Sequence, residues 1–206
     1  MKDLLRLGKN YLKLFVFWIL LFDFQRILFS VHNWDKLDSV SFSDLLLTFV
    51  YSIRLDLSTA AYLSALPVLF LCLGTVLRKK WVQSTFYYIL MFEVAIVALI
   101  HAGEINAYTE WNHKLTSQVF MHLAHPDEVF RTADYVMTFM FFLYATMEVV
   151  FGWRMYNWLL KNAIQPVVLH IQLKVQVATS ILCFLVLSGF SLLIARGGWQ
   201  QIPINI

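Results

Sequence analysis

The sequence is short of charged residues, which make up 14% of its 206 positions, against about 25% in soluble domains. Hydrophobic residues make up 60%, well above the roughly 45–50% of soluble domains. This composition excludes an ordinary soluble protein. Aromatic residues, at 17%, are typical of bilayer proteins, where they form belts at the two interfaces. We therefore interpret the chain as a membrane protein.

Motifs of common catalytic and cofactor sites are also missing. The sequence has no Cys-x-x-Cys-His, no phosphate-binding glycine loop and no Gly-x-Ser-x-Gly, the signatures of attached haem, bound nucleotides and serine hydrolases. Its only two cysteines, Cys72 and Cys183, lie inside apolar runs and imply no disulfide framework. No internal repeat is present. The sequence therefore predicts no catalytic residue, metal ligand or cofactor within this chain.

Five segments are long and apolar enough to cross a bilayer core of about 30 Å, which takes about 20 residues. The predicted spans are residues 11–31, 56–77, 81–101, 133–153 and 175–195. The first is no cleaved signal peptide, because its apolar part is too long and no small-residue cleavage site follows it. Pro67 is expected to kink the second. The expected fold is an all-α membrane protein with five transmembrane helices, in which residues 1–206 form one domain.

The basic residues predict how these spans are oriented. Ten of the sixteen lysines and arginines fall on one side of the five-span arrangement: Lys2, Arg6, Lys9, Lys13, Arg78, Lys79, Lys80, Arg154, Lys161 and Lys174. Because basic residues favour cytoplasmic loops, we expect the N-terminus in the cytoplasm and the C-terminus outside. These residues also account for the net charge of +3, so no nucleic-acid partner is implied.

Two segments between the spans are expected to form interfacial helices. Residues 41–54 begin with Ser41-x-x-Asp44, a pattern that resembles a helix-capping box. Together with the second span this helix is too long for one crossing. We therefore expect it to lie at the outer interface and to turn into the membrane near Arg54. Residues 155–174 are its cytoplasmic counterpart, broken at Pro166.

Charged residues inside or beside the spans gather toward the expected outer leaflet. Asp23 and Arg26 are three residues apart, so they share a helix face and can pair. Arg54 and Asp56 are two residues apart and point in different directions, so each needs a partner from elsewhere. Asp23 or Glu93 is a candidate partner for Arg54. The sequence therefore predicts a polar cluster at the level of the lipid headgroups.

Two interpretations of this cluster stay open at this point. Its charges either tie helices together, or its arginine binds the phosphate or carboxylate of a lipid headgroup in a forked geometry. A charge at bilayer depth is costly and is a functional candidate by default, but depth alone does not establish a site. Glu148, expected near the inner end of the fourth span, lies apart from the cluster.

Residues 101–134 form the longest polar segment and hold four of the six histidines. Their Glu-x-x-His spacing, as in Glu110-x-x-His113, occurs in di-iron carboxylate bundles. Those sites draw ligands from four buried helices, whereas this segment is one exposed loop. We therefore expect an interfacial helix with solvated polar side chains and no metal site. His101, expected at the outer surface, and His170, on the cytoplasmic side, cannot sandwich one haem.

Three regions resemble, in the same order, the lipoteichoic acid synthase family of bacterial membrane enzymes. Residues 54–58, RLDLS, resemble the family's Arg-x-Asp-Leu-Ser signature before a span. Positions of the outer loop that are similar to the family's tyrosine, aromatic, basic and proline pattern are Tyr108, Trp111, Lys114 and Pro126. Residues 196–205, RGGWQQIPIN, resemble the segment that leads out of the last span. Lys114 stands where the family more often has arginine.

The resemblance implies that this chain is the N-terminal transmembrane domain of such an enzyme, in the bacterial cytoplasmic (inner) membrane. In the family, a following extracellular domain of the sulfatase-like (alkaline phosphatase) superfamily carries a threonine nucleophile and a divalent metal, usually manganese. That domain moves phosphoglycerol or phosphoethanolamine from a phospholipid donor. It is absent from this chain, so the resemblance implies no catalytic or metal-binding residue here and an inactive chain. The implied partners are the bilayer, the phospholipid donor and a downstream or separate catalytic domain, in a parent phosphotransferase or sulfatase-like hydrolase.

Other classes of protein also fit the pattern of spans. A free-standing five-span protein would be a transporter subunit or an assembly scaffold. A transporter usually shows internal repeats or paired broken helices, whereas here only the second span has a central proline. A scaffold requires no motif at all. A third alternative is the product of a truncated or split gene whose catalytic half is a separate chain.

Overall fold

The computed structural model describes residues 2–37, 40–77, 80–111, 134–163 and 173–195. Every regular element within these residues is a helix, and none of them forms a strand. The helices are α1 (Lys2–His32), α2 (Phe42–Leu63), α3 (Ala65–Val76), α4 (Lys80–Trp111), α7 (Tyr135–Met155) and α8 (Leu173–Ala195), with a short 3-10 helix at Trp34–Lys36 and a π-helical turn at Tyr156–Leu160.

Several of these helices are long and apolar enough to cross a membrane. Four qualify on their own: Leu5–His32, Lys80–Thr109, Tyr135–Leu160 and Val177–Ala195. The pair Phe42–Leu63 and Ala65–Gly74, bent by 55°, makes a fifth span if it is counted as one. The expected all-helical membrane fold is therefore confirmed, and five is within the possible number of spans. The direction in which the chain crosses the membrane stays a prediction.

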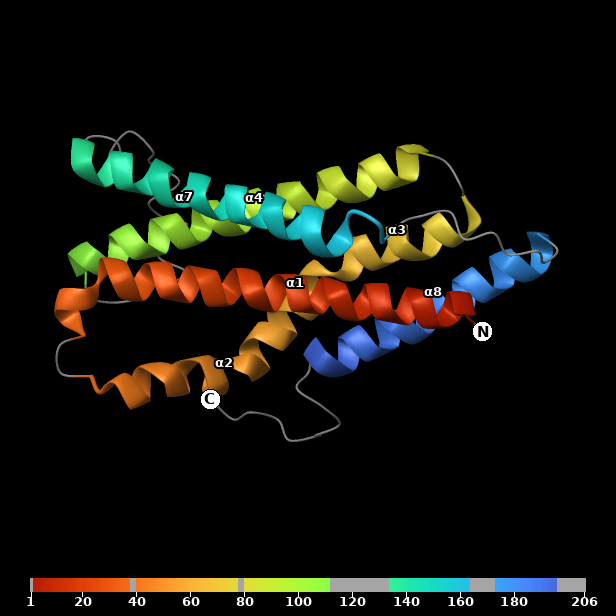
Figure 1. Ribbon diagram of the computed structural model, residues 1–206, viewed down its shortest axis with the longest axis horizontal. Helices are drawn as coiled ribbons and strands as arrows, with labels where there is room; N and C mark the ends of the chain where they lie inside the picture. The colour runs from red at the N-terminus through yellow and green to blue at the C-terminus, as the bar shows by residue number, and fades with distance from the viewer. Residues whose placement is uncertain (1, 38–39, 78–79, 112–133, 164–172, 196–206) are drawn as a thin grey trace.

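The helices form one elongated bundle around α1 (Figure 1). Helices α4 and α7 pack against each other and lie along one flank of α1, while α2 and α8 lie along the other; α3 contacts both α4 and α8. Helices α1 and α4 run in the same direction, from an end that we call the Lys80 end to an end that we call the His32 end. Helix α7 runs the opposite way.

Large apolar side chains at helical spacing form the core of the bundle. Leu14, Trp18 and Leu21 of α1 are at most 1% exposed. Helix α4 presents a matching stripe at every fourth residue: Val82, Phe86, Leu90, Val94, Ala98 and Ala102. Residues at this spacing lie on one helix face. Because lipid tails are as apolar as these side chains, close packing rather than exclusion of water holds such helices together.

Gly152 allows α7 to approach α4 closely. A Cβ atom added at this glycine would lie 2.8 Å from Cγ1 of Val94, closer than van der Waals contact allows. Gly189 in α8 has no such neighbour within 4 Å. Small residues have this role in many membrane helix interfaces, since they let two backbones come together. Gly152 therefore belongs to the α4–α7 contact.

The expected turn near Arg54 is wrong, because α2 continues unbroken from Phe42 to Leu63. The chain bends by 55° at Ser64 instead. Pro67 lies three residues further on, in the first turn of α3, where its missing N–H is tolerated. The expected cap at the start of α2 is confirmed: the Asp44 N–H donates to Ser41 Oγ at 3.2 Å. One helix thus replaces the expected interfacial helix and the first half of the second span.

The third span was expected to end at His101, but α4 continues for ten more residues to Trp111. Residues 101–111 are helical, as expected for this segment, but they continue α4 within the bundle instead of forming a separate interfacial helix. Residues 112–133 lie outside the described residues. At the other end, α7 continues into the π-helical turn at Tyr156–Leu160. The predicted break at Pro166 also falls outside the described residues.

Candidate functional site

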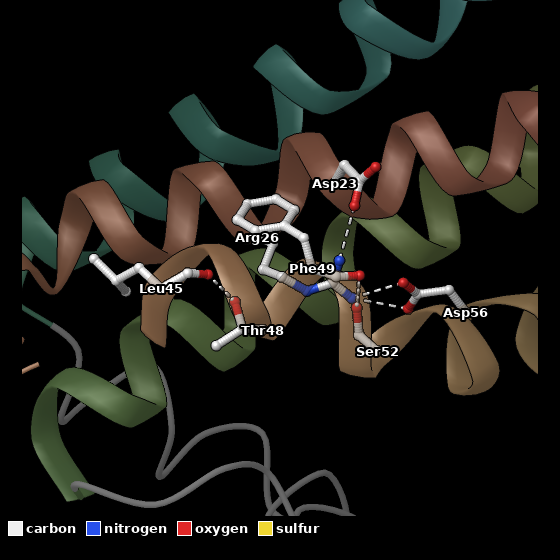
Figure 2. Close-up of polar contacts among 7 residues, drawn as sticks. All are labelled: Asp23, Arg26, Leu45, Thr48, Phe49, Ser52 and Asp56. Atoms are coloured by element: carbon white, nitrogen blue, oxygen red, sulfur yellow. Dashed lines mark hydrogen bonds and ion pairs between the residues drawn. The ribbon is translucent and has the colours of Figure 1, made fainter. Parts of the chain in front are cut away.

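Arg26 links α1 to α2 through an ion-pair cluster (Figure 2). Its Nη1 donates to Asp23 Oδ1 at 2.9 Å, which is the pairing expected from their spacing. Its Nη2 donates to both carboxylate oxygens of Asp56, at 2.8 and 2.9 Å. The Arg26 guanidinium also lies 5.5 Å from the centre of the Phe49 ring, within cation–π range. Figure 2 shows the arginine between the two carboxylates, which come from different helices.

Burial makes this cluster a strong tie between the two helices. The Asp56 side chain is 9% exposed and that of Arg26 is 22% exposed, so their attraction is screened less than that of a surface pair. Charge-assisted hydrogen bonds of this kind are roughly twice as strong as neutral ones. The cluster holds two carboxylates and one guanidinium, so its formal charge is negative. Asp56 therefore has a structural role in joining α2 to α1.

Arg54 takes no part in the cluster. It lies two residues before Asp56, and its side chain is exposed. Within the described part of the chain it makes no hydrogen bond or ion pair. The expected pairing of Arg54 with Asp23 or Glu93 is therefore not found: Asp23 binds Arg26, and Oε2 of Glu93 is buried without any hydrogen-bond partner among the described residues. The two charged residues of the RLDLS motif, Arg54 and Asp56, thus have separate environments.

A second polar cluster joins α1, α4 and α7. Gln25 Nε2 lies 2.5 Å from Oε2 of Glu148, and His101 Nδ1 lies 2.6 Å from Oε1 of the same carboxyl group. Glu148 is completely buried. The sequence placed His101 at the outer surface and Glu148 near the inner end of a span, and their contact shows that these two placements cannot both be right. The reason is that α4 extends ten residues beyond His101, while the π-helical turn extends α7 beyond Met155.

A third set of contacts closes the His32 end of the bundle. His32 Nδ1 lies 2.8 Å from the Tyr144 hydroxyl, and His32 Nε2 lies 3.0 Å from Thr109 Oγ1. Lys36 Nζ donates to the carbonyl oxygens of Tyr108 and Thr109 at 3.0 and 2.9 Å. A lysine in this place satisfies carbonyl groups in the last turns of α4. These contacts tie the end of α1 to α4 and α7.

The second and third sets lie on one side of α7, because Tyr144 and Glu148 are four residues apart and share a helix face. Sequence reasoning missed this polar strip. The signal was present in Gln25, a neutral polar residue between Asp23 and Arg26 in an apolar run, and in the Tyr144–Glu148 spacing. Neither signal identifies the partner helix.

The four outer-loop positions of the predicted motif are only partly covered by the structure. Tyr108 lies in α4, with its ring 4.9 Å from that of Phe29 and its carbonyl bound by Lys36. Trp111 is the last residue of α4. Lys114 and Pro126 lie outside the described residues. In the part of the chain that the structure describes, no three His, Cys, Asp or Glu side chains are grouped so that they could hold a metal ion.

The chain matches no protein-family model, no curated protein and no solved structure.

Proposed function

We propose that this chain is the membrane domain of a sulfatase-like lipid phosphotransferase in the bacterial cytoplasmic membrane. Its N-terminus lies in the cytoplasm and its C-terminus outside, so the His32 end of the bundle faces the outer leaflet. The domain anchors an extracytoplasmic catalytic domain, which carries the nucleophile and the divalent metal, and it positions the phospholipid donor. The support for this proposal is the three-part resemblance of the sequence, together with the surroundings of Arg54.

The environment of Arg54 is the observation that carries the proposal. Its neighbours on the exposed side of α2, Val50, Ile53 and Leu55, are apolar, so the guanidinium is a cation on a surface suited to lipid. Asp56, two residues away, is already occupied by Arg26. An unpaired guanidinium in such surroundings is suited to bind a phosphate oxygen pair. The motif thus combines a residue that fixes α2 with a residue that is free to bind a headgroup.

The level of Arg54 in the bundle agrees with this role. Asp56 is fixed at the level of Arg26, which lies six residues, or about 9 Å, from the end of α1 at His32. Arg54 precedes Asp56 by two residues of helix, about 3 Å nearer to the His32 end. In the proposed orientation Arg54 therefore lies just beneath the outer surface, at the depth of the lipid phosphates.

Replacing Arg54 in the full-length protein tests the proposal. Arg54→Ala should lower headgroup transfer from a phospholipid donor by about 10- to 100-fold, the effect of losing a hydrogen bond to a charged group. Arg54→Lys should retain part of the activity, because it keeps the charge but loses the fork. The matched control is Lys9→Ala, an exposed cation at the Lys80 end, which should leave transfer unchanged. Normal transfer by Arg54→Ala at normal protein abundance would contradict the headgroup role.

A transporter subunit is the second candidate, and the 55° break between α2 and α3 favours it. Broken helices carry the substrate and ion sites of many transporters. This candidate predicts solute flux by the chain alone in liposomes, which the anchor proposal does not.

A further inference from the structure

Three buried polar atoms have no hydrogen-bond partner among the described residues: Trp18 Nε1, Ser64 Oγ and Glu93 Oε2. Trp18 and Ser64 are completely buried. Buried polar groups in proteins are nearly always satisfied, either by protein atoms or by ordered water. The three residues come from α1, from the bend between α2 and α3, and from α4. One ligand can bind all three groups only if they lie at the same depth along the bundle.

Trp18 and Ser64 lie at the same level. Helices α1 and α2 are antiparallel, and the Arg26–Asp56 ion pair fixes their register. Trp18 precedes Arg26 by eight residues, and Ser64 follows Asp56 by eight residues. At 1.5 Å per residue, each lies about 12 Å from the ion pair in the direction of the Lys80 end. The indole nitrogen and the hydroxyl group therefore belong to one layer of the bundle.

Glu93 lies at the level of Ser64 as well. Helices α3 and α4 form an antiparallel hairpin, in which α3 ends at Val76 and α4 begins at Lys80. Glu93 is thirteen residues after the start of α4, and Leu63 is thirteen residues before the end of α3. Both are therefore about 20 Å from the turn of the hairpin. Glu93 and the bend at Ser64 therefore lie at the same depth along the bundle.

An independent contact places Glu93 at the level of Trp18. Helices α1 and α4 run in the same direction, and His32 of α1 contacts Thr109 of α4 at 3.0 Å. Glu93 precedes Thr109 by sixteen residues, and Trp18 precedes His32 by fourteen. The two levels therefore differ by about 3 Å. Three registers, from three different helix pairs, thus place the three polar groups at one depth.

The apolar side chains around the three residues are in contact with one another. Ala61 and Val68, which flank Ser64 on its helical face, belong to the same buried cluster as Trp18. Leu90 and Val94, which flank Glu93, belong to it too. The three polar groups thus border one buried apolar cluster. The carbonyl oxygen of Leu63 is a further acceptor at this bend, because Pro67, four residues later, has no N–H to donate to it.

We infer that Trp18, Ser64 and Glu93 form a binding site for internal water at the bend between α2 and α3. A water molecule there accepts a hydrogen bond from Trp18 Nε1–H, donates one to Glu93 Oε2 and shares a third with Ser64 Oγ. Three hydrogen bonds are typical of buried water in proteins. The indole only donates and the carboxyl group mainly accepts, so a small neutral molecule with both functions fits better than an ion. Water of this kind also satisfies backbone groups freed at helix bends.

Proton NMR of the indole groups tests this site in the full chain in lipid nanodiscs. The resonance of Trp18 is assigned by its loss in Trp18→Phe. Its indole proton should give a cross-peak with water, and a soluble gadolinium chelate should leave it sharp, because Trp18 is buried. The indole of Trp34, which is 56% exposed and lies beyond the end of the first candidate span at His32, is the reference for contact with bulk water. A Trp18 indole that shows no water cross-peak, or one that the chelate broadens, would overturn the inference.

Variants of the other two residues show whether the water depends on them. The double variant Ser64→Ala with Glu93→Leu should lose the Trp18–water cross-peak while keeping the other indole resonances. Ser180→Ala is the matched control, since Ser180 is also buried but donates to the Cys72 carbonyl at 2.7 Å. It should leave the cross-peak unchanged. A cross-peak that persists at full intensity in the folded double variant would place the water elsewhere.

Discussion

Arg26 and Asp56 are thirty residues apart in the sequence, yet Nη2 of the arginine lies 2.8 and 2.9 Å from the two carboxylate oxygens of the aspartate. This contact sets the register of α1 against α2, and it leaves Arg54 without an internal partner. The two charged residues of the RLDLS segment therefore predict opposite responses to mutation.

Asp56→Asn should destabilise the bundle, whereas Arg54→Gln should not. Asp56→Asn weakens the charge-assisted contact with Arg26 Nη2, although Arg26 keeps its pair with Asp23; losing a hydrogen bond to a charged group costs about 1.5–3 kcal/mol. Arg54 is exposed, and substitutions at exposed sites usually change stability by less than about 0.5 kcal/mol. Thermal unfolding of the purified chain in detergent measures both variants. Equal midpoints for the two would contradict the division of roles.

The second polar cluster predicts a difference between partial and complete replacement. Glu148→Leu leaves the Gln25 amide and the His101 ring without their acceptor, at a cost of about 1–3 kcal/mol for each stranded buried group. The triple variant with Gln25→Leu, His101→Phe and Glu148→Leu removes all three polar groups and should recover much of that loss. Unfolding midpoints of the single and triple variants make the comparison. A triple variant less stable than Glu148→Leu would mean that the three residues do not form one unit.

Gly152→Ala should destabilise the α4–α7 contact by about 1–3 kcal/mol, the usual cost of overpacking. The added methyl group would collide with Val94, so a second substitution, Val94→Ala, should restore part of the stability. Gly189→Ala is the matched control, because open space surrounds that glycine. It should be neutral or stabilising by up to about 1 kcal/mol, since alanine favours a helix. Equal effects of the two glycine substitutions would mean that Gly152 makes no close contact.

Much of the fold could be predicted because membrane helices are specified locally. An apolar run of about 20 residues predicts a span without reference to the rest of the chain. The cap at Ser41 and the Asp23–Arg26 pair also depend only on spacing along one helix, and both are present. The bend at Ser64, three residues before Pro67, lies close to the kink that the proline predicts.

The polar contacts between helices could not be predicted in the same way. Which side chain Arg26 meets on α2 depends on how both helices are rotated, and the apolar residues around Asp56 do not specify that rotation. The meeting of His101 with Glu148 depends on where α4 ends. A bilayer of fixed thickness predicts an end near His101, but the helix continues to Trp111 because polar helical residues extend beyond the apolar run.

The most direct test of the proposed anchor role is the mass of the native polypeptide in its own membranes. An antibody against residues 108–115 detects it on a denaturing gel, calibrated with the 206-residue chain of 24.1 kDa. The anchor proposal predicts a species far heavier than 24.1 kDa, or a 24.1 kDa species that co-purifies stoichiometrically with a metal-dependent phosphotransferase chain. A 24.1 kDa species that purifies alone and whose deletion leaves headgroup transfer unchanged would contradict the proposal.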